Sequence, residues 1–349
     1  MKKPNHKPFF SIVIPTYNRS KYLQCAIQGI VGQDYVDYEL IISDNASSDD
    51  TEKMVSQFLS NRVRYFRNTK NVGWIKNLQN AISHSKGKYI IFHGDDDFIY
   101  DRQCLRKLYE LLLHNPVGLI RLNYLSYSNQ FGEVFDFHVP KLTDIHINAK
   151  QTGEDVVSFI QKMDPFFVTG IVIRKNTGAV TKDFIDSEYV PWFPMMFNAL
   201  IKHGGRVCPT YSFVASWSQN SNPRYKMKQG VYSFEKYYYE VKKHVDEKYY
   251  KKFLREHIRV LVSEFPAAKY FLSTKEYIAF ALHALTLDTS LQISPYFWIY
   301  FLGSLVTPKF VLKSLRNYYL HKKCEAKIRG SKHILAHIAI FRKIKDDAV

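Results

Sequence analysis

The chain has 349 residues, 46% of them hydrophobic, four cysteines and a formal net charge of +17. This size suits one large globular domain with a smaller appendage. The cysteines are scattered, without a C-x-x-C pair, which argues against a disulfide framework or a structural zinc site and fits a cytoplasmic location. A strand-like run follows the basic N-terminus, so we expect no secretion signal.

The positive charge is concentrated in the C-terminal part of the chain. From Ser221 onward there are 24 Lys and Arg against 11 Asp and Glu, whereas residues 1–220 hold 25 and 21. We therefore expect a nearly balanced domain over residues 1–220 and a basic, aromatic-rich helical region over residues 221–349. Such a basic region favours an anionic partner, either nucleic acid or an acidic membrane surface.

The first hundred residues alternate between strand and helix patterns. Short apolar runs predict strands over residues 10–14, with a stop at Pro15, and over residues 38–43, 63–66 and 88–92. Apolar residues at helical spacing predict helices over residues 20–32, 49–59, 75–82 and 104–114. Asp49 is a plausible N-cap for the second helix, with Glu52 completing a capping box.

The pattern is less regular after residue 117. Residues 119–122 and 170–173 are typical of strands, residues 192–202 of a helix, and residues 207–218 of a closing strand and turn. Strands that alternate with helices of about 10–15 residues predict an α/β fold, whose mostly parallel sheet carries helices on both faces.

Polar residues gather where the predicted strands end. Thr16-Tyr17-Asn18, Asp44-Asn45 and Asp95-Asp96-Asp97 each follow one of these strands directly. Ligands of open α/β sheets bind at the carboxyl ends of the strands. The three clusters therefore predict one binding site at this edge of the sheet.

Three adjacent carboxylates repel one another, at a cost of about 1 kcal/mol per pair in water and more when partly buried. A bound cation removes this cost, and carboxylate oxygens suit Mg²⁺ or Mn²⁺. The simpler alternative is a solvated acidic turn that caps the helix after Asp101. The position of the run at a strand end, beside other polar clusters, favours the metal site.

Four motifs in order resemble glycosyltransferase family 2: residues 11–19, 39–49, 71–73 and 87–90, the last leading into the acidic run. The resemblance covers residues 9 to about 112. It implies the GT-A fold, whose sheet is Rossmann-like, with the acidic run as the family's DXD-type metal motif. The run Gly94-Asp95-Asp96-Asp97, together with Asn71-Val72-Gly73-Trp74 and Lys76-Asn77, is most similar to abequosyltransferase-like transferases of O-antigen synthesis.

The resemblance also implies roles for single residues. Those expected to bind the nucleotide sugar are Pro15, Thr16, Tyr17, Asn18, Asp44, Asn71, Gly73, Lys76 and Asp95. Tyr17 is the candidate for stacking on the base, and Asp44 for accepting a hydrogen bond from the base or ribose. Core packing of Tyr17, a strand-end turn at Asp44 and ordinary turn chemistry at Asn71 are the structural alternatives.

Within the acidic run, Asp96 is the first choice as a metal ligand, with Asp95 and Asp97 as the alternatives for its partner. The usual family pattern has another aspartate where Gly94 stands, so which two carboxylates bind the cation stays open. His93 alternates with the strand residues before it, and a core position is expected for its ring.

The acceptor hydroxyl needs a base, normally an Asp or Glu opposite the leaving group. In the family this base precedes a helix in the second half of the domain, where Asp186 and Glu188 stand here. The family's usual Glu-Asp pair is absent, and either residue can instead cap the helix. Asp164, before Pro165, is a lesser candidate.

Residues 291–312 are long and apolar enough for a membrane span by count, but Pro295, Gly303 and Pro308 argue against a regular spanning helix. Their Trp, Tyr and Phe residues favour a membrane interface, and basic residues follow directly. We expect peripheral contact with an anionic membrane on its inner, cytoplasmic face. A helical subdomain or a homo-oligomer interface is the alternative.

The expected function is metal-dependent transfer of a sugar from a nucleoside-diphosphate sugar to a glycan acceptor in surface polysaccharide synthesis, and a polyprenyl-linked acceptor is expected. The resemblance implies inversion at the anomeric carbon. A nicotinamide dehydrogenase is excluded because no G-x-G-x-x-G follows the first strand. Nucleic-acid binding does not explain the acidic run, and a non-catalytic scaffold with a degenerate site is the remaining alternative.

Overall fold

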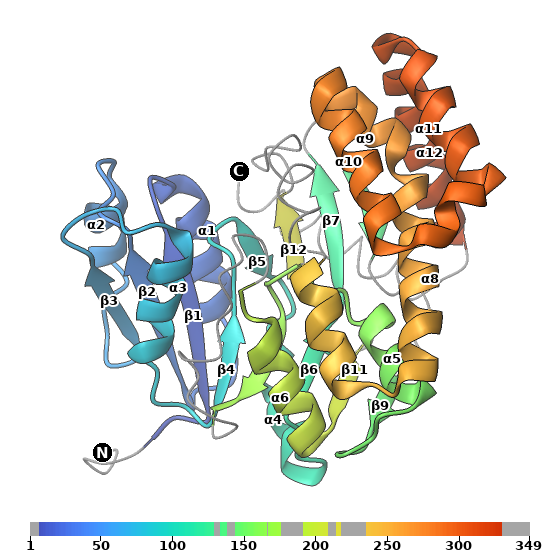
Figure 1. The fold of residues 1–349 in the computed structure, drawn as a ribbon. Coiled ribbons are helices and arrows are strands. Elements are labelled where there is room, and N and C mark those ends of the chain that lie inside the picture. The colour runs from blue at the N-terminus through green and yellow to red at the C-terminus, as the bar shows by residue number, and fades with distance from the viewer. Residues whose placement is uncertain are drawn as a thin grey trace.

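The computed structural model describes residues 7–128, 133–137, 144–165, 167–175, 191–208, 214–217 and 235–329. Its main sheet has eight strands in the order β3-β2-β1-β4-β10-β6-β11-β9 (Figure 1). They span Phe10–Thr16 (β1), Tyr38–Asp44 (β2), Val63–Arg67 (β3), Tyr89–Phe92 (β4), Leu119–Leu122 (β6), Ile145–Ile147 (β9), Ile171–Arg174 (β10) and Gly205–Cys208 (β11). Only β9 and β10 run antiparallel to their neighbours, which confirms the predicted mostly parallel sheet.

A second sheet has four strands in the order β5-β12-β7-β8. They span Asp97–Ile99 (β5), Tyr124–Ser128 (β7), Glu133–Phe137 (β8) and Val214–Trp217 (β12). The single closing strand predicted over residues 207–218 is wrong, because β11 ends at Cys208 in the main sheet and β12 belongs to the second one. Strand β5 begins within the acidic run, so the run is a connection between the two sheets.

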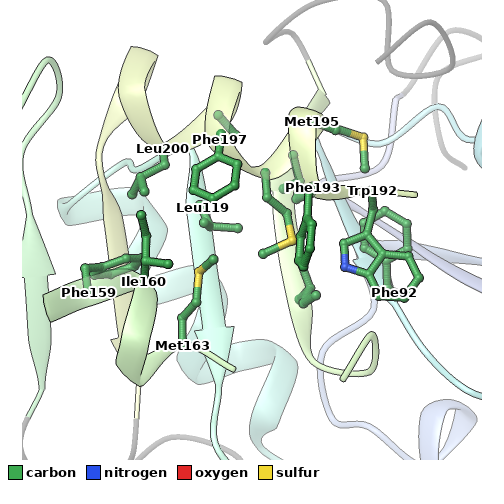
Figure 2. Packing of buried hydrophobic residues seen from close by; sticks show 14 of the residues in the cluster. Phe92, Leu119, Phe159, Ile160, Met163, Trp192, Phe193, Met195, Phe197 and Leu200 are labelled. Carbon is green, nitrogen blue, oxygen red and sulfur yellow. The ribbon is translucent and has the colours of Figure 1, made fainter. Parts of the chain in front are cut away.

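Helices cover both faces of the main sheet, as predicted. One face carries α1 (Ser20–Val31), α2 (Thr51–Ser56) and α4 (Cys104–His114), and the other carries α3 (Trp74–Ser83), α5 (Glu154–Lys162) and α6 (Phe193–His203). The pleat of β1 divides its residues between the two cores, with Ile12 and Ile14 on the α1 side and Val13 on the α3 side. Figure 2 shows Phe193, Phe197 and Leu200 of α6 pointing toward Leu119 of β6 and the apolar side chains of α5.

Two local predictions need correction. Strand β1 does not stop at Pro15 but continues to Thr16, which is in register with Asp44 of β2. Pairing of β1 with β4 ends at Val13, so the missing N–H of Pro15 costs no ladder bond on that side. The N-cap of α2 is Asp50, whose side chain makes no capping bond; the Asp49 carboxylate accepts bonds from Ser20 N and from the backbone N–H and hydroxyl of Thr51, the first residue of the helix.

The C-terminal part of the described chain is helical, as predicted (Figure 1). Its helices are residues 235–244, α8 (Glu247–Ser263), α9 (Phe265–Phe271), α10 (Thr274–Leu287), the 3₁₀ helix η3 (Thr289–Ile293), α11 (Pro295–Val306) and α12 (Lys309–Arg329). Tyr237, Val241 and Phe253 still pack in the core under α6, whereas residues from Ile258 onward form a separate apolar cluster.

Prolines interrupt the apolar stretch at residues 291–312, as the sequence predicts. Pro295 begins α11 and Pro308 separates it from α12, so the stretch is divided among η3, α11 and α12. Within the part of the chain that the structure describes, no helix combines the length and apolarity needed to cross a membrane.

Candidate functional site

The three polar clusters meet at one edge of the main sheet, as the sequence predicts. Thr16 and Asp44 are register partners at the ends of β1 and β2. The acidic run follows β4, the other neighbour of β1, and the Thr16 hydroxyl donates a 2.8 Å hydrogen bond to Asp95 Oδ2. The topology therefore brings residues separated by 79 positions into direct contact at the carboxyl ends of the strands.

Asp95 and Asp96 share one cationic partner. Arg19 Nη1 lies 3.0 Å from Asp95 Oδ1 and 2.9 Å from Asp96 Oδ2. Burial raises the pKa of the Asp95 carboxyl to about 6, although the neighbouring Arg19 acts in the opposite direction. Asp96 is more exposed than Asp95 and faces outward. The guanidinium thus relieves the repulsion that the sequence predicts for this run.

Asp97 faces the opposite side of the run. It is buried, and its Oδ2 accepts a hydrogen bond from the Thr169 hydroxyl just before β10. The same hydroxyl accepts a 2.8 Å bond from the backbone N–H of Gly94. Because Thr169 holds Asp97 in this way, Asp95 and Asp96 are the pair that the geometry presents together to a cation.

The structure gives a physical reason for Gly94, where the family usually has an aspartate. A Cβ at this position would lie 2.6 Å from Asp97 Oδ2 and 3.0 Å from Thr169 Oγ1. Both atoms are fixed by the hydrogen bonds that hold the turn. A side chain at position 94 is therefore incompatible with this arrangement of Asp97 and Thr169.

We expect Gly94→Ala to destabilise the protein by about 1–3 kcal/mol, the usual cost of inserting a carbon into a packed site. Thermal unfolding should show a lowered Tm. Gly303→Ala is the control, because nothing lies within 4 Å of its added Cβ and its backbone is helical. That control should leave the Tm unchanged or raise it; equal losses in the two variants would contradict the steric account.

The segment after β1 is tied to the loop after β2. Asn18 adopts a left-handed backbone with φ of 53°, and its Oδ1 accepts a 2.7 Å bond from Ser48 N. Asn18 N donates in turn to Ser47 Oγ. Tyr17, which precedes Asn18, is 44% exposed. It is therefore not a core aromatic, and its ring is accessible for stacking on a base.

Asp44 is completely buried and anchors the end of β2. Its carboxylate accepts hydrogen bonds from Ser47 and from the Tyr65 hydroxyl, at 2.6 Å for the latter, and Arg67 Nε lies 3.3 Å away. These contacts account for Asp44 as an organiser of the strand end. Its bond to a base or ribose stays a prediction.

Asn71, Gly73 and Lys76 lie together where the loop enters α3. Asn71 Oδ1 accepts from Asn45 Nδ2 and from Gly73 N, and Gly73 takes a positive φ of 84° at the N-cap of α3. Lys76 is exposed in the first turn of the helix. Loop geometry accounts for Asn71 and Gly73, so nucleotide binding by these three residues stays a prediction.

Asn77, beside Lys76, connects three elements. Its Nδ2 donates to Ser43 O at 2.8 Å and to Thr16 O at 3.4 Å, and its Oδ1 accepts from Ser43 Oγ and Asn68 Nδ2. The side chain is buried. It therefore fixes the ends of β1 and β2 relative to α3.

The residues predicted to act as the base, Asp186 and Glu188, lie outside the described residues. Asp164, the lesser candidate, lies beside the start of α6, since Trp192 Nε1 donates to the carbonyl of the adjacent Pro165. The Asp164 carboxylate accepts a hydrogen bond from the Tyr124 hydroxyl. Its backbone φ is 41°, in the left-handed region.

A buried cation lies between Asp97 and Asp164. Arg121 of β6 donates to the carbonyls of Phe167 and Thr169, and its guanidinium lies over the rings of Tyr124 and Phe167. Burial lowers its pKa, against the opposing charges of Asp164 and Asp97. Arg121 thus lies within electrostatic reach of both Asp97, in the acidic run, and Asp164.

His93 is buried at the end of β4, as expected. Its Nδ1 lies 2.7 Å from Gly94 O, and burial lowers its pKa to about 4. The ring is therefore neutral at pH 7 and belongs to the core rather than to a metal site.

The carboxylates of the run fit a divalent cation of the Mg²⁺ or Mn²⁺ type. In the described residues no group of three or more His, Cys, Asp and Glu side chains forms a complete metal cage. These ions are usually held by one or two carboxylates together with substrate phosphates. Asp95 Oδ1 and Asp96 Oδ2 already converge on one cationic nitrogen, that of Arg19, and so satisfy this requirement.

Sequence reasoning missed four residues of this edge: Arg19, Asn77, Thr169 and Arg121. Arg19 and Asn77 stand inside the motifs, but no pattern indicates which distant residues they contact. Thr169 and Arg121 lie next to or within strands and have no motif around them. A lone arginine in the apolar run Leu119–Leu122 was the one available signal for a buried cation.

The fold and the site define a class of protein: an α/β domain of the GT-A type with polar and acidic side chains gathered at the carboxyl ends of its strands. Residues 11–167 match the model of glycosyl transferase family 2. The match covers somewhat less than half of the chain, and in this region the chain is similar to the glycosyltransferases of that family.

Curated relatives agree with this class. The chain is 38% identical over 93 residues to the GalNAc(5)-diNAcBac-PP-undecaprenol beta-1,3-glucosyltransferase of Campylobacter jejuni, covering 26% of this chain and 30% of the relative. It is 39% identical over 92 residues to the abequosyltransferase RfbV of Salmonella typhimurium, covering 25% and 28%. The chain thus spans less than a third of the length of either relative.

Solved structures share the fold over most of the chain. S. aureus TarS 1–349 in complex with UDP-GlcNAc matches with a TM-score of 0.58 at 16% identity, covering 88% of this chain and 91% of that one. The mannosyltransferase PcManGT of Pyrobaculum calidifontis, in complex with GDP-Man and Mn²⁺, matches with a TM-score of 0.54 at 16% identity, covering 87% of each chain.

Proposed function

We propose that this chain transfers a sugar from a nucleoside-diphosphate sugar to a hydroxyl of a glycan acceptor, with a divalent metal ion and with inversion at the anomeric carbon. The observation that carries the proposal is the convergence of Asp95 and Asp96 on one cation beside Thr16. The nucleotide-sugar and Mn²⁺ complexes of structural neighbours support the same assignment.

In this proposal the donor lies along the carboxyl ends of β1, β2 and β4. Tyr17 stacks on the base, while Asp44 and the loop at Asn71–Gly73 border the nucleoside. Asp95 and Asp96 would hold Mn²⁺ or Mg²⁺, and the bound ion would supply positive charge to neutralise the leaving diphosphate. Asp97, held by its hydrogen bond with Thr169, borders the donor sugar.

The acceptor hydroxyl gives up its proton as it attacks the anomeric carbon. Asp186 or Glu188, ahead of α6, is the proposed base, and Asp164 borders the same helix start. The bond from sugar to diphosphate breaks on the opposite face, so the donor machinery and the base act from two sides of the sugar.

The acceptor is proposed to be a polyprenyl-linked glycan in surface polysaccharide synthesis. The undecaprenol named in the Campylobacter relative supports this acceptor class. Such an acceptor places the enzyme at the cytoplasmic face of the membrane, as a peripheral protein. Within this proposal, residues 1–220 are the catalytic domain and residues 221–349 the attachment or assembly region.

A thermal-shift panel of UDP, GDP, CDP and dTDP, each with and without Mn²⁺, tests the donor site. A ligand that binds only the folded protein at 100 times its Kd adds about 2.7 kcal/mol. We expect one nucleotide to raise the Tm, and to raise it further with Mn²⁺. No shift with any nucleotide would contradict the proposal; a shift without turnover of the matching labelled sugar nucleotide would favour a binding scaffold.

A further inference from the structure

Helix α11 presents an apolar face that no described part of the chain covers. Ile299, Leu302 and Val306 recur at helical spacing and are 69%, 49% and 77% exposed. Ile293 precedes this stripe and Phe310 follows it, at 86% and 73% exposure. The opposite side of α11 packs on α8 and α9 through the buried Phe297. The exposed side chains thus lie on a helix that the fold holds in place.

A basic groove lies along α8, the helix that α11 contacts. Its volume is about 450 Å³, and it is lined by Lys248, Lys251, Lys252, Arg255, Glu256 and Arg259. Lys251 and Lys252 pair with Glu247 and Glu154, while Arg255 and Arg259 make no salt bridge to any described carboxylate. The Tyr296 hydroxyl donates to Arg259 O, so the end of the groove meets the first turn of α11.

The charge around the stripe distinguishes a membrane from a second copy of the chain. Residues 289–324 contain five Lys and Arg and no Asp or Glu. Two copies meeting through this stretch would bring the five cations of each chain together, and the stretch itself offers no carboxylate to pair with them. An anionic lipid surface supplies phosphates for the cations and acyl chains for the apolar side chains.

The rim of the stripe has the chemistry of a membrane interface. Tyr296 and Trp298 are each 39% exposed, and each makes a hydrogen bond to a backbone carbonyl with its polar atom. Rings with one polar end are favoured where apolar and aqueous layers meet. In Figure 1, α11 and its neighbours α9, α10 and α12 lie at the end of the molecule toward which β4 and β7 point. The same end carries the candidate site.

We propose that the α11 stripe and the α8 groove form one docking surface for an anionic lipid bilayer. The stripe enters the boundary between headgroups and acyl chains, and the groove binds headgroup phosphates. This inference goes beyond the proposed reaction. Its test needs neither donor nor acceptor, so each proposal can fail without the other.

Co-sedimentation of the full chain with vesicles of phosphatidylglycerol and phosphatidylcholine tests the surface. The double variant Ile299→Glu/Val306→Glu should lower partitioning into mixed anionic vesicles by about tenfold or more. Val36→Glu/Leu113→Glu is the matched control, because it adds the same charge at two exposed apolar positions on the catalytic domain, each 59% exposed. This control should partition like the unmodified protein.

A second pair of substitutions tests the groove. Arg255→Gln/Arg259→Gln should weaken binding to anionic vesicles and reduce its dependence on salt, with little effect on vesicles of phosphatidylcholine alone. The proposal is overturned if the unmodified chain does not bind anionic vesicles, or if the stripe variant binds as well as its control. Light scattering gives a further test. The proposal is also overturned if the unmodified chain is a dimer, the stripe variant is a monomer, and that monomer still partitions into anionic vesicles unchanged.

Discussion

Asp96→Asn should abolish metal-dependent sugar transfer and leave the fold intact. The substitution keeps the size of the side chain but removes the negative charge that we propose for binding the cation. Loss of one group that stabilises charge in the transition state typically lowers kcat by roughly 10²–10³. Transfer from a labelled sugar nucleotide, measured over a series of Mn²⁺ concentrations, gives the size of the loss.

The fold should tolerate this change because Asp96 has one described partner and is partly exposed. Its ion pair with Arg19 is 2.9 Å long, and pairs of this kind contribute about 0–1 kcal/mol to stability. Asp34→Asn is the matched control, since Asp34 is also a partly exposed aspartate paired with an arginine, Arg106. Unchanged activity in Asp96→Asn, or an equal loss in Asp34→Asn, would refute the assignment of Asp96.

The ion pairs of Arg19 should lower the affinity of the site for a metal ion alone. Its guanidinium bridges Asp95 and Asp96 in this structure, so a cation that binds both carboxylates replaces the arginine as their partner. The affinity for Mn²⁺ alone therefore includes the loss of two ion pairs. A nucleoside diphosphate gives the released guanidinium a new anionic partner, which is a physical reason to expect metal and nucleotide to bind together.

The sequence predicts the sheet and the position of the site because both depend on local patterns. Apolar runs such as Tyr38–Asp44 form strands, and residues that follow parallel strands meet at one edge whatever the loops do. The same reasoning fails where pairing decides the outcome. Residues 207–218 are typical of one closing strand and turn, yet the segment holds the end of β11 and all of β12, which belong to different sheets.

The contacts inside the site are harder to predict from the sequence for the same reason. Gly94 looked like a departure from the family pattern, and only the proximity of Asp97 and Thr169 explains it. Asp44 and Asn71 were assigned to the nucleotide from their motifs, but in the structure they also hold loops in place. A motif identifies which residues a site needs and leaves open which of them touch the ligand.

Asn77→Ala should destabilise the fold at this edge of the sheet. Asn77 is buried, and its amide makes the four hydrogen bonds that join α3 to Thr16, Ser43 and Asn68. Leaving buried partners unsatisfied costs about 1–3 kcal/mol for each group. Thr16 O has a second donor in Asn45 N, so we expect a total of about 3 kcal/mol, measured as a lowered midpoint of urea unfolding.

Asn80→Ala is the control because it makes the same substitution one turn later in α3. Asn80 is half-buried and donates one side-chain bond, to Asn68 Oδ1 at 2.9 Å. The gain in helix propensity on replacing Asn by Ala is the same at both positions and cancels in the comparison. Asn77→Ala should also weaken nucleotide binding, since Thr16 and Asp44 lose their fixed spacing from α3. Equal midpoints for the two variants would show that Asn77 does not organise the site.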